Sequence, residues 1–195
     1  MVALSKSESF NKSFLPYIEM YNTYFGSGLS SIVFQEIRES RALAYSANSR
    51  ISTPDKLDDS HYLSFSAMTQ ADKLADVVSA FNELFAELPE ATEQFEGAKI
   101  NILKEIESER ITKTSIYREY RDAKKKGLDE DVRKYIYDTI KSMTFSDFSA
   151  FFKNQLNERS FHYVVIGNKS KVNMDILSSL GEVKELSRKE VFNYD

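Results

Sequence analysis

Histidine and cysteine set the first limit on the chemistry of this 195-residue chain. The chain has no Cys, which excludes thiolate nucleophiles, disulfides and Cys-ligated metals, and it has two His residues. His61 lies just before a predicted strand and His162 lies inside one. Neither belongs to H-E-x-x-H or to its inverse, H-x-x-E-H, the patterns that place zinc ligands on one face of a helix. We therefore expect no metal site in this chain.

A glycine- and serine-rich segment, Gly26-Ser-Gly-Leu-Ser30, is the second candidate for chemistry. It resembles a phosphate-binding loop at the start of a helix, but it lacks the Walker lysine and follows a helix rather than a strand. The G-x-S-x-G pattern of serine hydrolases is also absent from the chain. On these residues alone, the segment ends one helix and caps the next.

Charged residues form two dense clusters that both favour a structural interpretation. The basic run Lys124–Lys126 is typical of a solvated helix carboxyl end, where cations complement the helix dipole. Glu105, Glu107 and Glu109 occupy alternate positions of a predicted helix. Because alternate helical residues point about 200° apart, these carboxylates do not converge on one metal or substrate.

Arg38 and Tyr45 form the remaining candidate pair, in the segment Arg38-Glu-Ser-Arg-Ala-Leu-Ala-Tyr45. We expect them on either side of a turn between a helix and a strand. A guanidinium and a phenol in that position can both donate hydrogen bonds to peptide carbonyls or to a developing oxyanion. The competing interpretation, which these residues alone favour, is that Arg38 pairs with a surface carboxylate and Tyr45 caps the core.

Hydrophobic periodicity predicts the elements that position these residues. Strands alternate irregularly with helices, so we expect an α+β fold in which a mostly antiparallel sheet packs under several helices. Capping boxes at Thr69–Asp72 and Thr144–Asp147 each announce a helix. The predicted helices are 14–24, 30–41, 72–88, 92–110, 131–143, a helix after Thr144, and 172–180, and the predicted strands are 44–51, 62–68, 161–166 and 183–186.

Composition excludes several classes of protein. A formal charge of −4 and a pI near 5.4 argue against binding to nucleic acid or to an anionic membrane surface. No apolar run approaches the roughly 20 residues that span a bilayer, and the amino terminus has no signal-peptide core. Without a linker or a repeat, residues 1–195 are predicted to form a single domain, and its compartment is left open.

The segment Phe25–Tyr45 resembles a recurrent segment of the insulinase/pitrilysin/mitochondrial processing peptidase family of zinc metallopeptidases. In that family a glycine-containing loop precedes a helix that ends in Arg-Glu, and a strand then begins at Gly/Ala-Leu-Ala/Gly-Tyr. The resemblance continues more loosely through Leu63-Ser-Phe65, Phe161–Gly167 and Leu180-Gly-Glu-Val183.

The resemblance implies a role for the pair. Family members close two similar halves over an unfolded peptide: one half carries zinc on H-x-x-E-H, and the other contributes an Arg and a Tyr seven residues apart. This chain has the second pattern, Arg38 and Tyr45, and lacks the first, so it resembles a non-zinc half. The resemblance implies that Tyr45 and Arg38 contact the scissile peptide. It also implies that a zinc-bearing partner half holds the zinc, and that the two halves together enclose the unfolded peptide substrate. Gly26, Ser27 and Gly28 would belong to a substrate-contacting loop.

The family pattern also places a strand before the first helix, where this chain has only a polar lead. We therefore expect a substrate-clamping domain that lacks its first strand and derives from a longer protein. Two other functions remain open: an assembly scaffold that has lost catalysis, and a module that binds extended peptides on a sheet edge.

Overall fold

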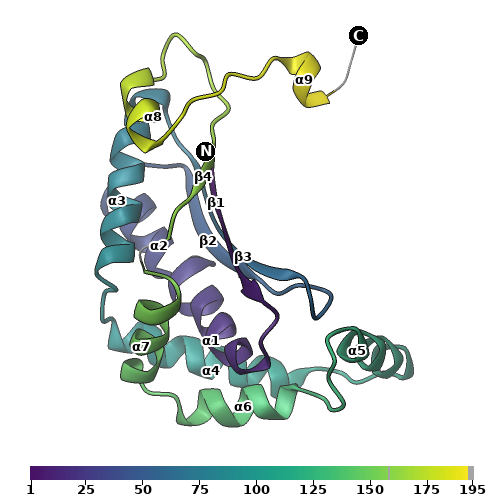
Figure 1. Cartoon of the computed structure of the whole chain (residues 1–195). Helices are drawn as coiled ribbons and strands as arrows, with labels where there is room; N and C mark the ends of the chain where they lie inside the picture. Colours follow the sequence, from purple (N-terminus) through teal and green to yellow (C-terminus); the bar gives the residue numbers. More distant parts are fainter. Residues whose placement is uncertain (158, 193–195) are drawn as a thin grey trace.

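The computed structural model describes residues 1–157 and 159–192 and arranges them as a sheet with helices packed on one face (Figure 1). In this part of the chain the sheet has four strands in the order β2-β3-β1-β4, and all neighbouring strands are antiparallel. The predicted fold class is therefore confirmed. The strands are β1 (Val2–Ser9), β2 (Ser46–Ser52), β3 (Ser60–Met68) and β4 (His162–Val164).

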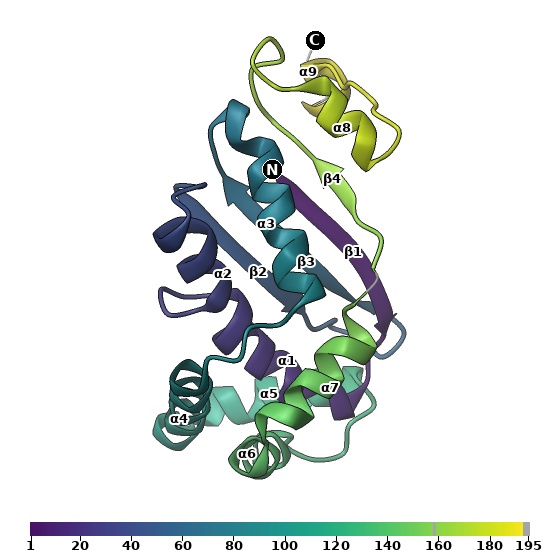
Figure 2. The same ribbon diagram turned by 90° about the vertical axis from the view of Figure 1, so that its left-hand side faces the viewer.

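Helices cover one face of the sheet, with α3 (Leu74–Ala86) lying along it (Figure 2). In the described residues the opposite face is open, and α5 (Lys113–Lys125) and α9 (Arg188–Phe192) stand at its two ends (Figure 1). The other helical segments are η1 (Lys12–Phe14), α1 (Leu15–Met20), η2 (Tyr21–Gly26), α2 (Ile32–Phe34), η3 (Gln35–Ser40), η4 (Ala71–Lys73), α4 (Thr92–Ser108), α6 (Arg133–Ser142), α7 (Phe145–Gln155) and α8 (Met174–Leu180).

Strand alternation separates the two faces of the sheet. In β3, Leu63 and Phe65 are buried towards the helices, while Ser64 and Ser66 turn to the open face, as the period of two predicts. The register places Ser64 between Leu4 of β1 and Arg50 of β2, so the open face mixes polar, charged and apolar side chains.

Aromatic rings fill the space between the sheet and the helices. Phe65 stacks on Phe81 of α3 with ring centroids 3.9 Å apart. The Tyr24 hydroxyl donates a hydrogen bond of 2.7 Å to the Pro89 carbonyl and accepts one of 3.1 Å from the Ala91 N–H, which fixes the turn between α3 and α4. Aromatic pairs of this kind add about 0.5–1.5 kcal/mol each beyond their buried area.

The prediction that the chain lacks its first strand is wrong. β1 lies inside the sheet and pairs with β3 on one side and β4 on the other. Its buried side chains are small, Ala3 and Ser5, while the larger Val2 and Leu4 lie on the open face. The sequence of β1 therefore has no apolar strand pattern, although its backbone forms hydrogen-bond ladders with both β3 and β4.

Near the carboxyl end, the predicted strand 161–166 is shorter than expected, and the predicted strand 183–186 does not form. The run 161–166 was predicted as a strand, but only His162–Val164 pair with a neighbouring strand, and Val164 and Ile166 are 58% and 91% exposed. β4 is the outermost strand of the sheet, so it has a neighbour on one side only. Residues 183–186, predicted as a closing strand, adopt no regular structure.

The predicted helices around the candidate site are confirmed, with wider turns than expected. α1 continues into the π-helical segment η2, and α2 continues into the π-helical η3. Insertions of this type are frequent at functional sites.

Only one of the two predicted capping boxes forms. Thr144 and Asp147 cap α7 reciprocally, as predicted. Thr69 does not cap a helix: its hydroxyl donates to the carbonyl of Leu43 at 2.6 Å, and α3 begins without a side-chain cap. A tertiary hydrogen bond has replaced the local one.

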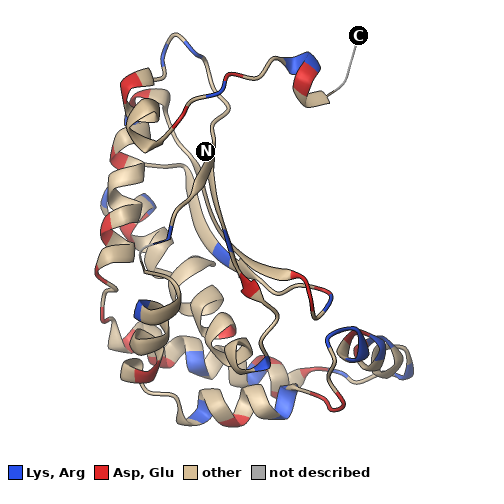
Figure 3. Cartoon of the chain, viewed as in Figure 1, with Lys and Arg blue, Asp and Glu red and all other residues tan. Residues whose placement is uncertain are grey.

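Helix α5 carries a charge opposite to that of the chain. Residues 113–126 contain six basic and two acidic side chains, whereas the whole chain has a net charge of −4. Lys124 and Lys125 lie in the last turn of α5, which confirms the predicted basic helix terminus. None of the α5 side chains is buried, and Figure 3 shows its basic residues clustered away from the main body.

In the described residues, no helix combines the length and the apolar character that crossing a membrane requires.

Gly26 offers a test of how tightly η2 packs on β2. A Cβ at position 26 would lie 2.0 Å from the Ser49 carbonyl oxygen, whereas a Cβ on Gly97 in α4 would have no neighbour within 4 Å. We expect Gly26→Ala to lower the free energy of unfolding by about 3 kcal/mol, since backbone atoms must move to admit the methyl group. Gly97→Ala, the matched control, should raise it by about 0.5–1 kcal/mol. Urea denaturation of both variants checks this, and equal stabilities would contradict the packing described.

His61 offers a test of pH dependence. Its ring is 1% exposed; Nδ1 lies 3.2 Å from the Ser52 carbonyl, to which it donates, and Nε2 accepts from the Asn11 N–H at 3.4 Å. Burial lowers the pKa of His61 in the folded protein, so the folded state holds the neutral ring.

Stability should therefore fall as the pH drops below about 6.5, where the unfolded chain binds a proton that the folded chain does not. The fall continues until the pH reaches the folded pKa of His61. His61→Gln removes this contribution, so urea denaturation from about pH 7.5 to about pH 5.5 should show a shallower decline for the variant. An equally steep decline would show that His61 titrates alike in both states.

Candidate functional site

Arg38 and Tyr45 lie on either side of the turn that links η3 to β2, as predicted. The turn is closed by backbone hydrogen bonds from the Ala42 N–H to the Arg38 carbonyl (3.1 Å) and from the Leu43 N–H to the Ile37 carbonyl (2.9 Å). At its far end the Tyr45 N–H donates to the Met68 carbonyl at 2.8 Å, which starts the pairing of β2 with β3. The helix and the strand thus meet within a few residues.

Two side chains from outside the turn hold its carbonyls. The Thr69 hydroxyl donates to the Leu43 carbonyl at 2.6 Å, and the Lys73 ammonium donates to the Ala42 carbonyl at 3.0 Å. Ala42 itself has φ of 49°, in the left-handed region that L-residues rarely adopt.

The Arg38 guanidinium lies between two aromatic rings. Its carbon is 4.8 Å from the ring centroid of Phe34 and 5.6 Å from that of Tyr45. Its ion pair with the adjacent Glu39 is long, 3.7 Å, and exposed, so it contributes little. The rings orient the guanidinium while its N–H groups keep donating capacity.

Tyr45 does not cap the core, because its side chain is 76% exposed. The competing interpretation, in which Arg38 pairs with a surface carboxylate and Tyr45 caps the core, is therefore wrong for Tyr45. Its phenol stands beside the Arg38 guanidinium at a hollow of about 950 Å³. The hollow is lined by Met1, Arg38, Glu39, Ala42, Leu43, Ala44, Tyr45, Ala67, Met68, Thr69, Gln70, Lys73 and Ile166.

This hollow can bind a group that accepts several hydrogen bonds. A guanidinium and a phenol offer donors from one side, with the Lys73 ammonium nearby. A peptide carbonyl or an oxyanion is a suitable acceptor for such a set. Thr69 and Lys73 were missed by sequence reasoning: Thr69 is 26 positions from its partner Leu43, and its spacing to Asp72 indicated a helix cap instead.

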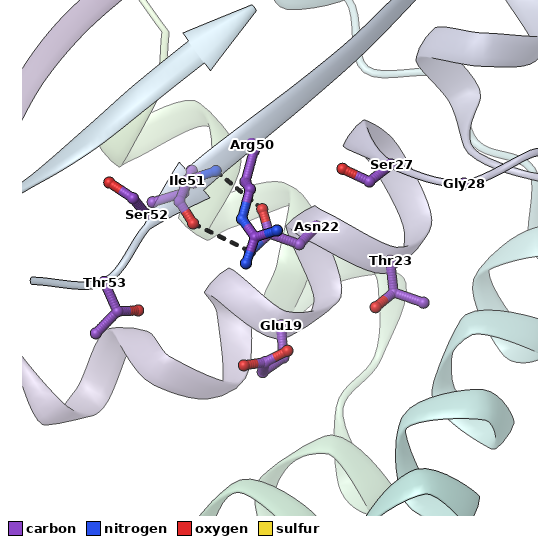
Figure 4. Close-up of a pocket in the computed structure, with 9 residues that line it drawn as sticks. All are labelled: Glu19, Asn22, Thr23, Ser27, Gly28, Arg50, Ile51, Ser52 and Thr53. Atoms are coloured by element: carbon purple, nitrogen blue, oxygen red, sulfur yellow. Dashed lines mark hydrogen bonds between the residues drawn. The ribbon is translucent and has the colours of Figure 1, made fainter. Parts of the chain in front are cut away.

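The loop of Gly26, Ser27 and Gly28 lies at a different hollow, of about 540 Å³ (Figure 4). Gly26 packs against the β2 backbone, the Ser27 hydroxyl donates to the Ser49 carbonyl at 3.1 Å, and Gly28 has φ of 93°. Ser31 caps α2 and donates to the Gly28 carbonyl at 2.9 Å. The loop therefore has the structural role that its residues alone indicated, and its hollow shares no described lining residue with that of Arg38 and Tyr45.

Residues of opposite charge line this second hollow, where Figure 4 shows Glu19 and Arg50 among the lining residues. Desolvation and the negative charge of Glu105 raise the pKa of Glu19, and Arg50 counteracts them. Asn22 binds the β2 edge with both ends of its amide, donating to the Ile51 carbonyl at 3.0 Å and accepting from the Ile51 N–H at 2.9 Å.

The structure does not bring the two histidines together. His61 is buried on the helix side of β3, and His162 is exposed on β4, with β1 between the two strands. Among the described residues, no group of three or more His, Cys, Asp or Glu side chains is placed to hold a metal ion.

Comparison with known proteins gives two sequence matches. Residues 17–102, which include Arg38 and Tyr45, match the family model of the peptidase M16 inactive domain. An uncharacterized zinc protease of Mycobacterium leprae is 42% identical over 69 residues, which are 35% of this chain and 15% of that protein.

Solved structures share the fold at low sequence identity. The inactive peptidase domain of a proposed zinc protease from Bordetella parapertussis aligns with a TM-score of 0.67 and 15% identity, covering 84% of this chain and 91% of that one. The peptidase M16 inactive domain from Pseudomonas fluorescens aligns with a TM-score of 0.66 and 16% identity, covering 80% and 38%.

The periplasmic protease PqqL from Escherichia coli aligns with a TM-score of 0.58 and 14% identity, covering 80% of this chain and 17% of that one. This chain thus spans a minor part of several of the proteins it matches. The predicted resemblance is confirmed: residues 17–102 match the model of the peptidase M16 inactive domain, and solved inactive domains of this type share the fold.

Proposed function

We propose that this domain is the non-zinc half of a zinc metalloendopeptidase that encloses unfolded peptides. The observation that supports this most is the pairing of the exposed Tyr45 with the half-buried Arg38 at one hollow, on a fold of the inactive-domain type. A scaffold has no need to display an exposed phenol beside a guanidinium held between two rings.

In the proposed mechanism the two side chains act on the scissile peptide. Tyr45 donates a hydrogen bond to the carbonyl oxygen as negative charge develops on it, and Arg38 fixes the adjacent backbone carbonyl. Zinc bound in the partner half, in the same polypeptide or in a separate subunit, supplies the activated water for hydrolysis.

The loop at the second hollow has a smaller part in this proposal. Gly26 is committed to its contact with Ser49, whereas Ser27 and Gly28 line the hollow and are the candidate contacts for a more distant part of the peptide.

Substitution of the pair tests the function. In the full-length protein with its zinc-bearing half, we expect Tyr45→Phe to lower kcat for an unfolded protein such as β-casein by about 10²- to 10³-fold, as loss of one oxyanion donor does. Arg38→Ala should lower kcat/KM at least tenfold. Both should leave zinc content and thermal stability unchanged, since Tyr45 is exposed and the Arg38 ion pair is weak.

Tyr117→Phe and Arg118→Ala, exposed on α5, are the matched controls and should retain wild-type rates. If the Arg38 and Tyr45 variants cleave as fast as these controls, the catalytic role is wrong and the alternative, a non-catalytic scaffold or peptide-binding partner, takes its place.

The domain alone should be inactive. The chain has no H-x-x-E-H motif, so we expect this 195-residue segment to release no cleavage products from β-casein, with or without added zinc. Mass spectrometry of the incubation mixture checks this. Zinc-dependent products from the purified segment would show that it builds a metal site of its own.

A further inference from the structure

We propose that Thr69 and Lys73 are positioning residues that hold the turn between Arg38 and Tyr45 in its working shape. This inference rests on the proposed function and extends it to two residues whose side chains donate hydrogen bonds to the backbone of the turn. The two hydrogen bonds from Thr69 and Lys73 to the turn carry the argument.

Both hydrogen bonds come from one short segment outside the turn. Thr69 follows β3 directly and Lys73 ends η4, and they bind the consecutive carbonyls of Leu43 and Ala42. Met68, the residue before Thr69, accepts the hydrogen bond of the Tyr45 N–H. Residues 68–73 thus bind three backbone groups of the turn: the Ala42 carbonyl, the Leu43 carbonyl and the Tyr45 N–H.

Ala42 shows why the turn needs this support. Its φ of 49° is unfavourable for a residue with a Cβ, so the free segment would prefer a negative φ. The hydrogen bond to its own carbonyl and the one to the next carbonyl oppose that relaxation.

The shape of the turn determines the distance between the two proposed catalytic groups. Arg38 is fixed by η3 and by the Phe34 ring, and Tyr45 is fixed by β2, so the turn is the covalent connection between them. Relaxation at Ala42 would move the start of β2 relative to the end of η3. The Arg38 guanidinium carbon would then no longer lie 5.6 Å from the centroid of the Tyr45 ring.

The test uses the full-length protein with its zinc-bearing half and β-casein as the probe. Thr69→Val removes the hydroxyl and Lys73→Met removes the ammonium while each keeps its size. Thr139→Val and Lys99→Met are matched controls, because each loses a donor to a backbone carbonyl elsewhere: Thr139 to Tyr135 at 2.8 Å and Lys99 to Met143 at 2.8 Å.

We expect Thr69→Val and Lys73→Met each to lower kcat about five- to tenfold, the effect of one lost hydrogen bond, with KM changed less than about twofold. Thr69→Ser and Lys73→Arg keep a donor and should keep the wild-type kcat. The controls should shift the melting temperature as much as the test variants do, yet leave kcat unchanged.

A rescue experiment addresses the strain directly. Glycine adopts positive φ without penalty, so Ala42→Gly added to Thr69→Val should recover most of the lost kcat. A purely structural role for Thr69 would not predict recovery of kcat by a substitution at Ala42.

The outcomes separate the two hypotheses. If the Arg38 and Tyr45 variants lose activity but Thr69→Val and Lys73→Met match the Thr139 and Lys99 controls, the positioning role is overturned and the proposed function stands. If the Arg38 and Tyr45 variants are fully active, both are overturned.

Discussion

The close contact between η2 and the outer strand β2 is the constraint on which the rest of the domain depends. Without a side chain at Gly26, the helical backbone approaches the Ser49 carbonyl, and the Asn22 amide pairs with both backbone groups of Ile51 beside it. An exposed edge strand would otherwise offer these groups to another chain. Here the helix layer covers them and fixes β2, and through β2 it fixes Tyr45.

The candidate site combines rigid supports with one strained connection. Arg38 belongs to a π-helical turn and Tyr45 directly precedes a strand, so each side chain stands on or beside regular structure. The residues between them include a left-handed alanine held from outside by Thr69 and Lys73. Strain of this kind persists only where surrounding contacts over-determine the backbone, and it is frequent at functional sites.

Sequence reasoning succeeded where the governing interactions are local. The periodicity of β3 and the capping box of Thr144 and Asp147 are written in consecutive residues, and both are confirmed. The turn between Arg38 and Tyr45 was predictable for the same reason, since a helix pattern ends and a strand pattern begins within it. Reasoning failed where partners distant in sequence decide the outcome. β1 has small buried residues and is a strand because β3 and β4 pair with it. Thr69 has the spacing of a helix cap, but the Leu43 carbonyl, brought near by the β2–β3 pairing, takes its hydroxyl.

The charge of α5 gives the domain an electrical asymmetry. With +4 on residues 113–126 and −4 on the whole chain, the remaining residues carry −8, so the molecule has a dipole that runs from its main body towards this helix. Such a dipole turns the molecule in the field of any charged surface before contact is made, with α5 leading towards negative charge. At physiological ionic strength, salt screens the electric field beyond about 8 Å. The orientation of α5 during its approach to a charged neighbour therefore depends on ionic strength, even where the final contact does not.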